Sequence, residues 1–336
     1  MASRIVLGIV IIGLLGGSGY FAMNYKIESR TENGKRSYAI IPRDAPAGPT
    51  PTVPDTPANN NLPPAAGKAT FTIATYNLGG LDENKLSNLR VSDVLTQLLR
   101  RFDLVAVEGL RGKNQGVPVR LVELLNAGGR QYDFATCPTQ QRDGIEHYSG
   151  FIFDKAVVEV DRSTVHFVED PQRRFRRKPL AGLFRTRASP QPFTFYLVAV
   201  DTDPERPAAE IDLLADVFRA VRDIPRSDGP SEDDVIMLGD FEADDHHLGR
   251  LGNVPNITAA IGDVIPTTAR GTKMADNILF DRRATIEFTG RAEVVDMMRE
   301  FELTVQAAAE ISEHLPVWAE FSVFEGGPHG FVPREQ

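Results

Sequence analysis

Strand-like and helix-like segments alternate along residues 69–324, and this alternation restricts the fold more than any other feature of the chain. Apolar runs such as FTIATYNL (71–78) and DVIMLGDF (234–241) are typical of buried strands, whereas NKLSNLRVSDVLTQLLRRF (84–102) carries leucines at helical spacing. Further strand-like runs lie at 103–110, 132–137, 148–154, 179–187, 193–200, 277–283 and 317–324, and further helix-like runs at 117–129 and 207–224. Because strands outnumber helices, we predict an α/β fold, a four-layer α/β sandwich in which two packed mixed β-sheets are flanked by helices.

The first 26 residues are predicted to anchor the chain in a membrane. Residues 5–23 carry no charged side chain, and at about 1.5 Å per helical residue such a stretch just spans the apolar core of a bilayer. The sequence therefore predicts a single-pass membrane protein with a signal anchor, or transmembrane segment, over residues 1–26. A cleaved signal peptide, which would make the protein secreted, is the alternative, with the small residues at 16–19 near its cleavage site.

Two irregular segments are predicted to flank the domain at 69–324. Residues 43–68 are rich in Pro, Ala, Asn and Thr and lack an apolar period. We therefore predict a disordered, Pro-rich linker over 27–68. Residues 325–336 are predicted to be a flexible tail.

The net charge of the chain is −9, which disfavours a generic nucleic-acid-binding protein. It leaves room for an enzyme that meets nucleic acid through a local basic patch and a metal ion. The single cysteine, Cys137, excludes an intramolecular disulfide. The sequence gives no sign of an oligomer.

Polar side chains recur at the ends of the predicted strands. They are Asn77, Glu108, Glu146, Tyr148, Asp201, Asp240, Glu242, Asp276, Glu313 and His314. Strand ends at one edge of a sheet converge in space, and α/β folds build their sites there. Clustered carboxylates repel each other unless a cation neutralises them, and oxygen ligands of this kind select Mg²⁺, or else Mn²⁺ or Ca²⁺. A divalent ion beside a His and an Asn suits phosphoester hydrolysis.

Seven motifs in order along residues 69–324 carry a family resemblance. They are TYNLGG, DLVAVEGL, IEHYSGFIFD, RRKPLAGLF, LGDFEA, PTTARGTKMADNILF and ISEHLPVWAEF. Together they resemble the endonuclease/exonuclease/phosphatase superfamily, especially its deoxyribonuclease-I-like branch. The resemblance implies catalytic roles for His314, Asp276, Asp240, Asp201 and Glu146, substrate contacts from Asn77, Arg177, Tyr148 and Glu242, and metal ligation by Glu108, Glu313 and Asp240.

Three positions depart from the family pattern. Asp201 stands where the family has a His, Glu242 where it has an Asn, and Glu313 where it has an Asp. The exchange at 313 keeps the charge, but Glu242 replaces a donor by an acceptor that repels phosphate. With Asp at position 201, the family's imidazole, which serves as a general acid near neutral pH, is missing. The carboxylate of Asp201 would instead face the carboxylate of Glu146.

Two functions follow from these observations. The first is a membrane-anchored, divalent-metal-dependent phosphoesterase with an altered active site, whose substrate is a phosphate ester, with nucleic acid as one candidate. The second is a catalytically inactive member of the fold that serves as a binding or scaffold module. The retained residues favour an enzyme, whereas the three departures favour the scaffold. Asp201 could also be only a polar stop to its strand, and the pair at 246–247 is expected to lie in a surface loop.

Overall fold

The computed structural model describes residues 25–32, 35–42, 69–112, 116–137, 140–142, 145–225, 231–262 and 265–327. The chain divides into two compact units, Met1–Leu62 and Pro63–Gln336. In the first unit, β1 (Tyr25–Glu32) and β2 (Lys35–Pro42) form a two-stranded antiparallel sheet. β1 begins in the last two residues of the segment predicted as an anchor, and the rest of both strands falls inside the segment predicted as a linker, where the sequence pattern does not reveal them. Residues 1–24 of the predicted membrane segment lie outside the described residues, as do residues 328–336 of the predicted tail. Among the helices that are described, none has the length and apolar character needed to cross a membrane.

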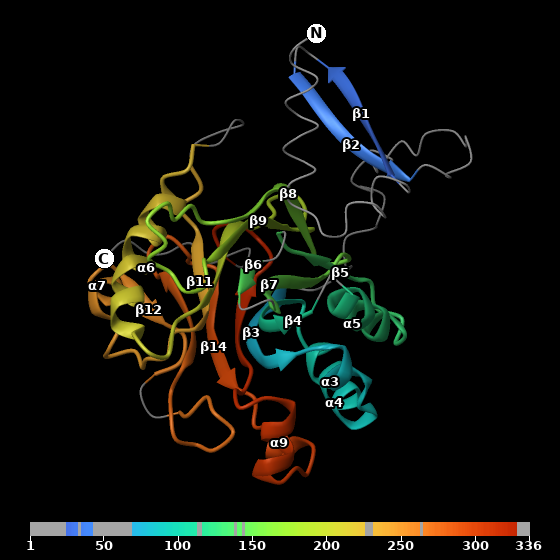
Figure 1. The fold of residues 1–336 in the computed structure, drawn as a ribbon. Helices are drawn as coiled ribbons and strands as arrows, with labels where there is room; N and C mark the ends of the chain where they lie inside the picture. Colours follow the sequence, from blue (N-terminus) through green and yellow to red (C-terminus); the bar gives the residue numbers. More distant parts are fainter. Residues whose placement is uncertain are drawn as a thin grey trace. The chain divides into compact units, whose positions relative to one another are not determined.

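Two mixed β-sheets pack face to face in the second unit (Figure 1). One has the strand order β12-β13-β11-β10-β9-β8, and the other has the order β14-β15-β3-β4-β7-β5, with β6 paired to β7. The strands are β3 (Thr70–Leu81), β4 (Leu104–Arg111), β5 (Tyr132–Ala135), β6 (Gln140–Arg142), β7 (Ile145–Asp154), β8 (Val158–Phe167), β9 (Leu180–Thr186), β10 (Thr194–Asp201), β11 (Val235–Asp240), β12 (Ile257–Ala259), β13 (Asp276–Asp281), β14 (Phe288–Val294) and β15 (Val317–Ser322). The helices are α3 (Glu83–Ser87), α4 (Leu89–Leu99), α5 (Gly116–Asn126), α6 (Pro207–Arg222), α7 (Gly249–Gly252), α8 (Met297–Glu300) and α9 (Val305–Ile311).

Helices cover the outer face of each sheet, so the unit has four layers (Figure 1). Apolar residues of α4, α5 and α9 pack against β3, β4 and β7. Those of α6 and α7 pack against β10, β11 and β13. A third apolar cluster, rich in phenylalanine, fills the space between the two sheets. The predicted four-layer sandwich of two mixed sheets is confirmed.

Strand β10 illustrates how alternation builds these layers. Phe195, Leu197 and Ala199 belong to the cluster between the sheets. Val198 and Val200 belong instead to the cluster under α6. Because successive side chains of a strand point to opposite faces, a central strand buried on both faces reads as a continuous apolar run. Each large side chain buried in this way stabilises the fold by about 1.5–3 kcal/mol.

One predicted helix is in fact two. The run at 84–102 divides into α3 and α4, which meet at Asn88. The side chain of Asn88 accepts hydrogen bonds from the backbone N–H groups of Arg90 and Val91, so it caps the N-terminus of α4. Because the leucine spacing continues across Asn88, the sequence pattern does not reveal that the helix is interrupted there.

Candidate active site

Strand pairing brings the acidic strand ends to one edge of the sandwich. In the six-stranded sheet, Asp201 ends β10 opposite Asp240, which ends the parallel strand β11. Asp276 begins the antiparallel strand β13 and also lies opposite Asp240. In the other sheet, Asn77 of β3 lies opposite Glu108 of the parallel strand β4. The convergence expected from the sequence is therefore present in the backbone register of both sheets.

Asn77 connects the two sheets at this edge. Its Nδ2 donates to Oδ2 of Asp240 at 3.0 Å, and its Oδ1 accepts from the N–H of Gly79 at 3.0 Å. The amide approaches β4 so closely that a Cβ at Gly109 would lie 2.6 Å from Oδ1 of Asn77. Gly109 has a φ of 68°, a conformation that glycine adopts without strain. The residue after Glu108 is thus required to be a glycine.

His314 lies between two carboxylates. Its Nδ1 is 2.9 Å from Oδ2 of Asp276, and its Nε2 is 3.6 Å from Oδ2 of Asp240. Burial alone would lower the pKa of His314, but the charge of Asp276, its hydrogen bond and the charge of Asp240 raise that pKa to about 10. In the absence of a metal ion, His314 is therefore a cation at neutral pH and acts as a hydrogen-bond donor.

Two hydroxyl groups fix this arrangement. Thr267 Oγ1 donates to Oδ2 of Asp276 at 3.0 Å. Ser312 Oγ donates to the backbone oxygen of Asn77 at 2.6 Å and accepts from the N–H of His314 at 3.0 Å. Neither residue is among the predicted site residues, although both lie inside the quoted motifs PTTARG and ISEHLP. Ser312 adjoins the predicted residue Glu313, whereas for Thr267 the signal was its place in the motif that leads to Asp276.

Asp240, Asp276 and His314 form a group whose ligand atoms all lie within 4.8 Å of one another. The group fits a hard divalent cation, because it offers two carboxylates and because Oδ1 of buried Asp276 has no hydrogen-bond partner. Glu108 is buried close by, where Thr75 Oγ1 lies 3.3 Å from both of its carboxylate oxygens. Burial, and then the negative charge of Asp201 and the other strand-end aspartates, raises the pKa of Glu108 well above its usual value. Glu108 is thus close enough to the strand-end aspartates for their negative charges to act on it.

Asp201 is buried at the active-site edge and forms an ion pair. The Nη1 of Arg177 donates to its Oδ1 at 2.6 Å. Burial raises the pKa of Asp201 to about 6, although Arg177 acts in the opposite direction. A carboxyl group with this pKa titrates in the range that is usual for histidine.

The other two departing residues also have cationic partners. Glu242 has a φ of 52° and lies 3.2 Å from Nζ of Lys273, while its N–H donates to Oδ1 of Asp240 at 3.0 Å. Glu313 accepts from Nε and Nη2 of Arg270 at 3.0 and 3.1 Å. These hydrogen bonds lower the pKa of Glu313. The group of ligand atoms around Asp240 does not include the side chains of Glu242 and Glu313.

The remaining predicted residues are less closely involved. Glu146 belongs to β7, and its side chain lies outside the described part of the structure. Tyr148 is buried in the same strand, opposite Leu110 of β4. His247 is exposed, as expected for a surface loop, and its Nδ1 lies 2.6 Å from Oδ1 of Asp244.

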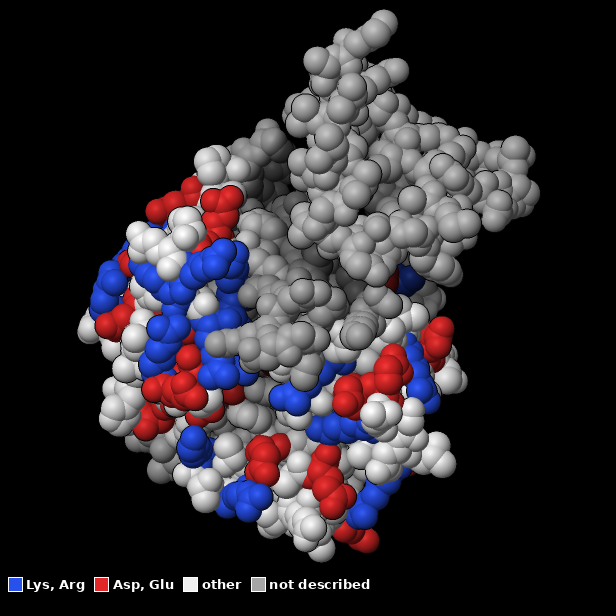
Figure 2. Space-filling model, in the orientation of Figure 1, with Lys and Arg blue, Asp and Glu red and all other residues white. Residues whose placement is uncertain are grey.

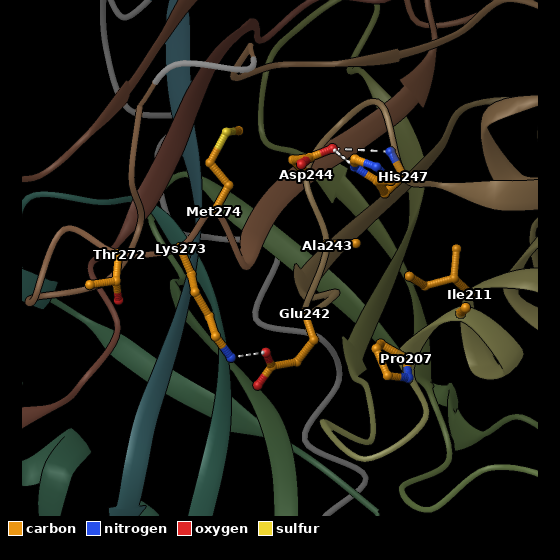
Figure 3. A pocket seen from close by; sticks show the side chains of 10 residues that line it. Pro207, Ile211, Glu242, Ala243, Asp244, His247, Thr272, Lys273 and Met274 are labelled. Carbon is orange, nitrogen blue, oxygen red and sulfur yellow. Dashed lines mark hydrogen bonds and ion pairs between the residues drawn. The ribbon is translucent and has the colours of Figure 1, made fainter.

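A pocket of about 400 Å³ adjoins the site through Glu242 (Figure 3). It is lined by Pro207, Ala208, Ile211, Glu242, Ala243, Asp244, His247, Thr272, Lys273 and Met274. Figure 3 shows the ion pair of Lys273 and Glu242 on one side of the pocket and the pair of His247 and Asp244 on another.

Several known proteins resemble this chain. Deoxyribonuclease gamma of Rattus norvegicus is 25% identical over 271 residues, which cover 75% of this chain and 84% of that protein. Deoxyribonuclease-1-like 2 of Mus musculus is 27% identical over 268 residues, which cover 76% of this chain and 93% of that protein. The crystal structure of D. rerio TDP2 humanised by 14 mutations has a TM-score of 0.52 at 17% identity and covers 76% of this chain and 100% of its own. No protein-family model matches the chain. The structural likeness concerns the fold, and the sequence likeness extends over most of the second unit.

Proposed function

We propose that this chain, which belongs to the endonuclease/exonuclease/phosphatase superfamily through its deoxyribonuclease-I-like domain, is a divalent-metal-dependent phosphoesterase. The observation that supports the proposal most directly is the convergence of Asp240, Asp276 and His314 at one strand edge. The nuclease names of the relatives suggest nucleic acid as the substrate. The uncharged stretch at 5–23 supports a membrane anchor as part of the same proposal.

Asp240 and Asp276 would hold Mg²⁺, Mn²⁺ or Ca²⁺, with Glu108 close to them. When bound, such a cation neutralises charge on a phosphoryl oxygen. His314, protonated and held by Asp276, would donate to a non-bridging phosphate oxygen. Asn77 uses one N–H on Asp240 and has a second N–H left for the phosphate.

Asp201 would supply the proton that the leaving oxygen needs. The family's histidine is absent, but burial gives the carboxyl of Asp201 a pKa of about 6. A buried carboxylic acid of this pKa is a competent general acid in weakly acidic solution. If a substrate phosphate draws Arg177 away, Asp201 loses the charge that opposes its raised pKa, and its protonated form becomes more populated.

The second candidate function is an inactive binding module, and one observation favours it. Each of the three departing residues is paired with an arginine or lysine of the same chain. A cation held in this way is less available to a substrate phosphate. The same fold could then serve as a scaffold without hydrolysing anything.

An activity assay separates the two candidates. The purified full chain is tested on phosphodiester and phosphomonoester substrates with Mg²⁺, Mn²⁺ and Ca²⁺ in turn. Asp240→Asn and His314→Gln are expected to lower kcat at least about 100-fold, because each removes a charged group of the site. The matched control is Asp244→Asn with His247→Gln, which alters a hydrogen-bonded Asp–His pair on the surface. Hydrolysis equal to that of the Asp240→Asn variant with every metal would reject the enzyme and leave the scaffold.

A further inference from the structure

A buried glutamate of α6 joins the two segments that bring Arg177 and Asp201 together. Glu210 lies in the first turn of the helix and is 1% exposed. Its Oε1 accepts from the N–H of Arg176 at 2.6 Å, and its Oε2 accepts from the N–H of Asp203 at 3.0 Å. Arg176 adjoins Arg177 in the sequence, and Asp203 follows Asp201 by two residues. One carboxylate therefore holds the backbone on both sides of the Arg177–Asp201 ion pair.

The side chain of Asp203 provides a second link between the same two segments. Asp203 is buried, and its Oδ1 accepts from Nη1 of Arg176 at 2.7 Å. Its Oδ2 accepts from Nε of Arg206 at 3.3 Å, and Nη2 of Arg206 donates to the backbone oxygen of Arg174 at 3.1 Å. The segment before Arg177 and the loop after β10 are thus joined through both backbone and side-chain groups.

The segment that carries Arg177 has no strand pairing of its own to fix it. Residues 168–179, all of them described, contain neither a helix nor a strand. Backbone N–H groups of such a segment need partners outside a strand ladder, and the N–H of Arg176 finds one in Glu210. A charged acceptor makes this hydrogen bond about twice as strong as a neutral one would. The place of Arg177 therefore depends on Glu210.

We propose that Glu210 is a positioning residue of the active site, which holds Arg177 where its guanidinium reaches both Asp201 and a substrate phosphate. The inference rests on the proposed phosphoesterase function, because that function gives Arg177 a phosphate to bind. Arg177 is half-buried, and its partner Asp201 lies opposite Asp240 in the sheet, so the guanidinium is at the edge that carries the candidate metal ligands. A guanidinium binds phosphate through directed hydrogen bonds, and a misplacement of about 1 Å can cost about 100-fold in rate.

The first test measures the Arg177–Asp201 ion pair, because this measurement needs no substrate. A double-mutant cycle of Arg177→Met and Asp201→Asn, by urea unfolding of the purified full chain in EDTA at pH 8, gives the coupling of the two residues well above the pKa of Asp201. Glu210→Ala should reduce this coupling to less than about half of its wild-type value. The matched control is Asp212→Ala, because Asp212 lies on the same helix and accepts the N–H of Arg250 at 2.7 Å. No coupling in the wild type, or equal coupling in Glu210→Ala, would overturn the proposal.

Glu210→Gln is the milder variant, because it keeps the size of the side chain and replaces one of the two accepting oxygens by an NH₂ group. It should weaken the coupling by less than Glu210→Ala does. With single-stranded DNA and Mg²⁺, it should raise KM about fivefold or more with a smaller change in kcat, because the contact of Arg177 is made already in the bound substrate. A purely structural role would lower the folded fraction, and with it the apparent kcat, at unchanged KM.

The two measurements separate this inference from the proposed function. Loss of the coupling in the Glu210 variants of a protein that hydrolyses nothing would reject the enzyme and uphold the positioning of Arg177. Hydrolysis by the wild type, together with a coupling and a KM that Glu210→Gln leaves unchanged, would reject the positioning role and uphold the enzyme.

Discussion

Each of the three residues that depart from the family pattern has a cationic partner, but the three ion pairs differ in burial and in how much they stabilise the fold. The side chains of Arg270 and Glu313 are 63% and 50% exposed, and an exposed pair of this kind contributes only about 0–1 kcal/mol. Lys273 is exposed as well, but the side chain of its partner Glu242 is only 14% exposed. The carboxylate of Asp201, which pairs with Arg177, is buried most deeply of the three, and Asp201 is 7% exposed. Position 201 is therefore the residue at which the chemistry of this chain diverges most from the pattern of the family.

The first prediction concerns the pH dependence of hydrolysis. Only protonated Asp201 can give a proton, so kcat/KM should fall about tenfold per pH unit above pH 6. Asp201→His should move this fall to higher pH, toward the ordinary histidine pKa of about 6.5, and raise kcat/KM at pH 7.5 by about threefold or more. Asp201→Asn removes the charge without supplying an acid and serves as the control. A pH–rate profile that is identical in the wild type and in Asp201→Asn would exclude Asp201 as the acid.

The raised pKa of Asp201 also makes the stability of the protein depend on pH. In the metal-free protein, Asp201 binds its proton more tightly when folded than when unfolded. The stability that it contributes is therefore complete at low pH and is lost as pH rises through about 6. Asp201→Asn should flatten this part of the stability curve, measured by urea unfolding in EDTA between pH 4 and pH 7.

The second prediction concerns Glu242, which faces the pocket and holds Lys273. Glu242→Asn restores a neutral donor and frees the ammonium group, so affinity for single-stranded DNA should rise. The slope of log Kd against log salt should steepen by about one phosphate contact. Glu302→Asn is a matched control, because Glu302 is exposed and has a φ of 50°, close to the 52° of Glu242. Equal DNA affinity of wild type and Glu242→Asn, measured by anisotropy titration, would show that Lys273 does not reach a phosphate.

At the scale of elements, the sequence predicted the central strands and the edge strand β5, but it missed the edge strands β8, β12 and β14. β10 and β11 are buried on both faces and read as continuous apolar runs. β8 and β14 lie at sheet edges, and most of their residues are exposed or half-buried. Their polar composition resembles that of loops, because an edge strand needs little apolar surface. A strand that is buried on both faces has a continuous apolar sequence, and this is what allows it to be predicted from one sequence.

The candidate site was predictable to a similar degree. Strand-end residues such as Asp240 and Asp276 were predicted to converge, because motif order places them on neighbouring strands. The partners of the departing residues were not predicted, because Arg270 and Lys273 lie in a loop whose path depends on tertiary contacts. The raised pKa of Asp201 was equally hidden, since burial depends on packing from both sheets. Sequence order thus locates the site, whereas its electrostatics require the fold.

The third prediction tests the pairing of β10 and β11. Gly239 has a φ of 140°, and a Cβ there would lie 2.0 Å from the backbone oxygen of Val200. Gly239→Ala must therefore push the two strands apart next to Asp240, and it should lower the free energy of unfolding by at least about 2 kcal/mol. Gly262→Ala, where a Cβ would meet nothing within 4 Å, is the control. Chemical denaturation of both variants measures the difference, and equal stability would mean that the strands can shift freely.

At the scale of the whole molecule, the charge distribution limits how substrate can be bound. The net charge is −9, and acidic and basic side chains are interspersed over the face shown in Figure 2. A polyanion therefore meets no broad attractive field on that face, and binding has to rely on local contacts at the strand edge. A phosphoesterase of the proposed kind would gain from being held near its substrate. A membrane anchor would provide this through confinement.

The fourth prediction concerns that anchor. If residues 1–26 form a signal anchor, the full chain should remain in the membrane pellet after alkaline carbonate extraction, and a chain lacking these residues should be released. Val10→Arg with Leu14→Arg should release it as well, because each arginine in the middle of a spanning segment costs about 2.5–3.5 kcal/mol. Val10→Leu with Leu14→Ile changes the same positions without charge and should stay in the pellet. A secreted chain whose N-terminus begins near residues 16–19 would instead establish the cleaved signal peptide. Any binding that holds the protein near its substrate would then have to come from the second unit itself.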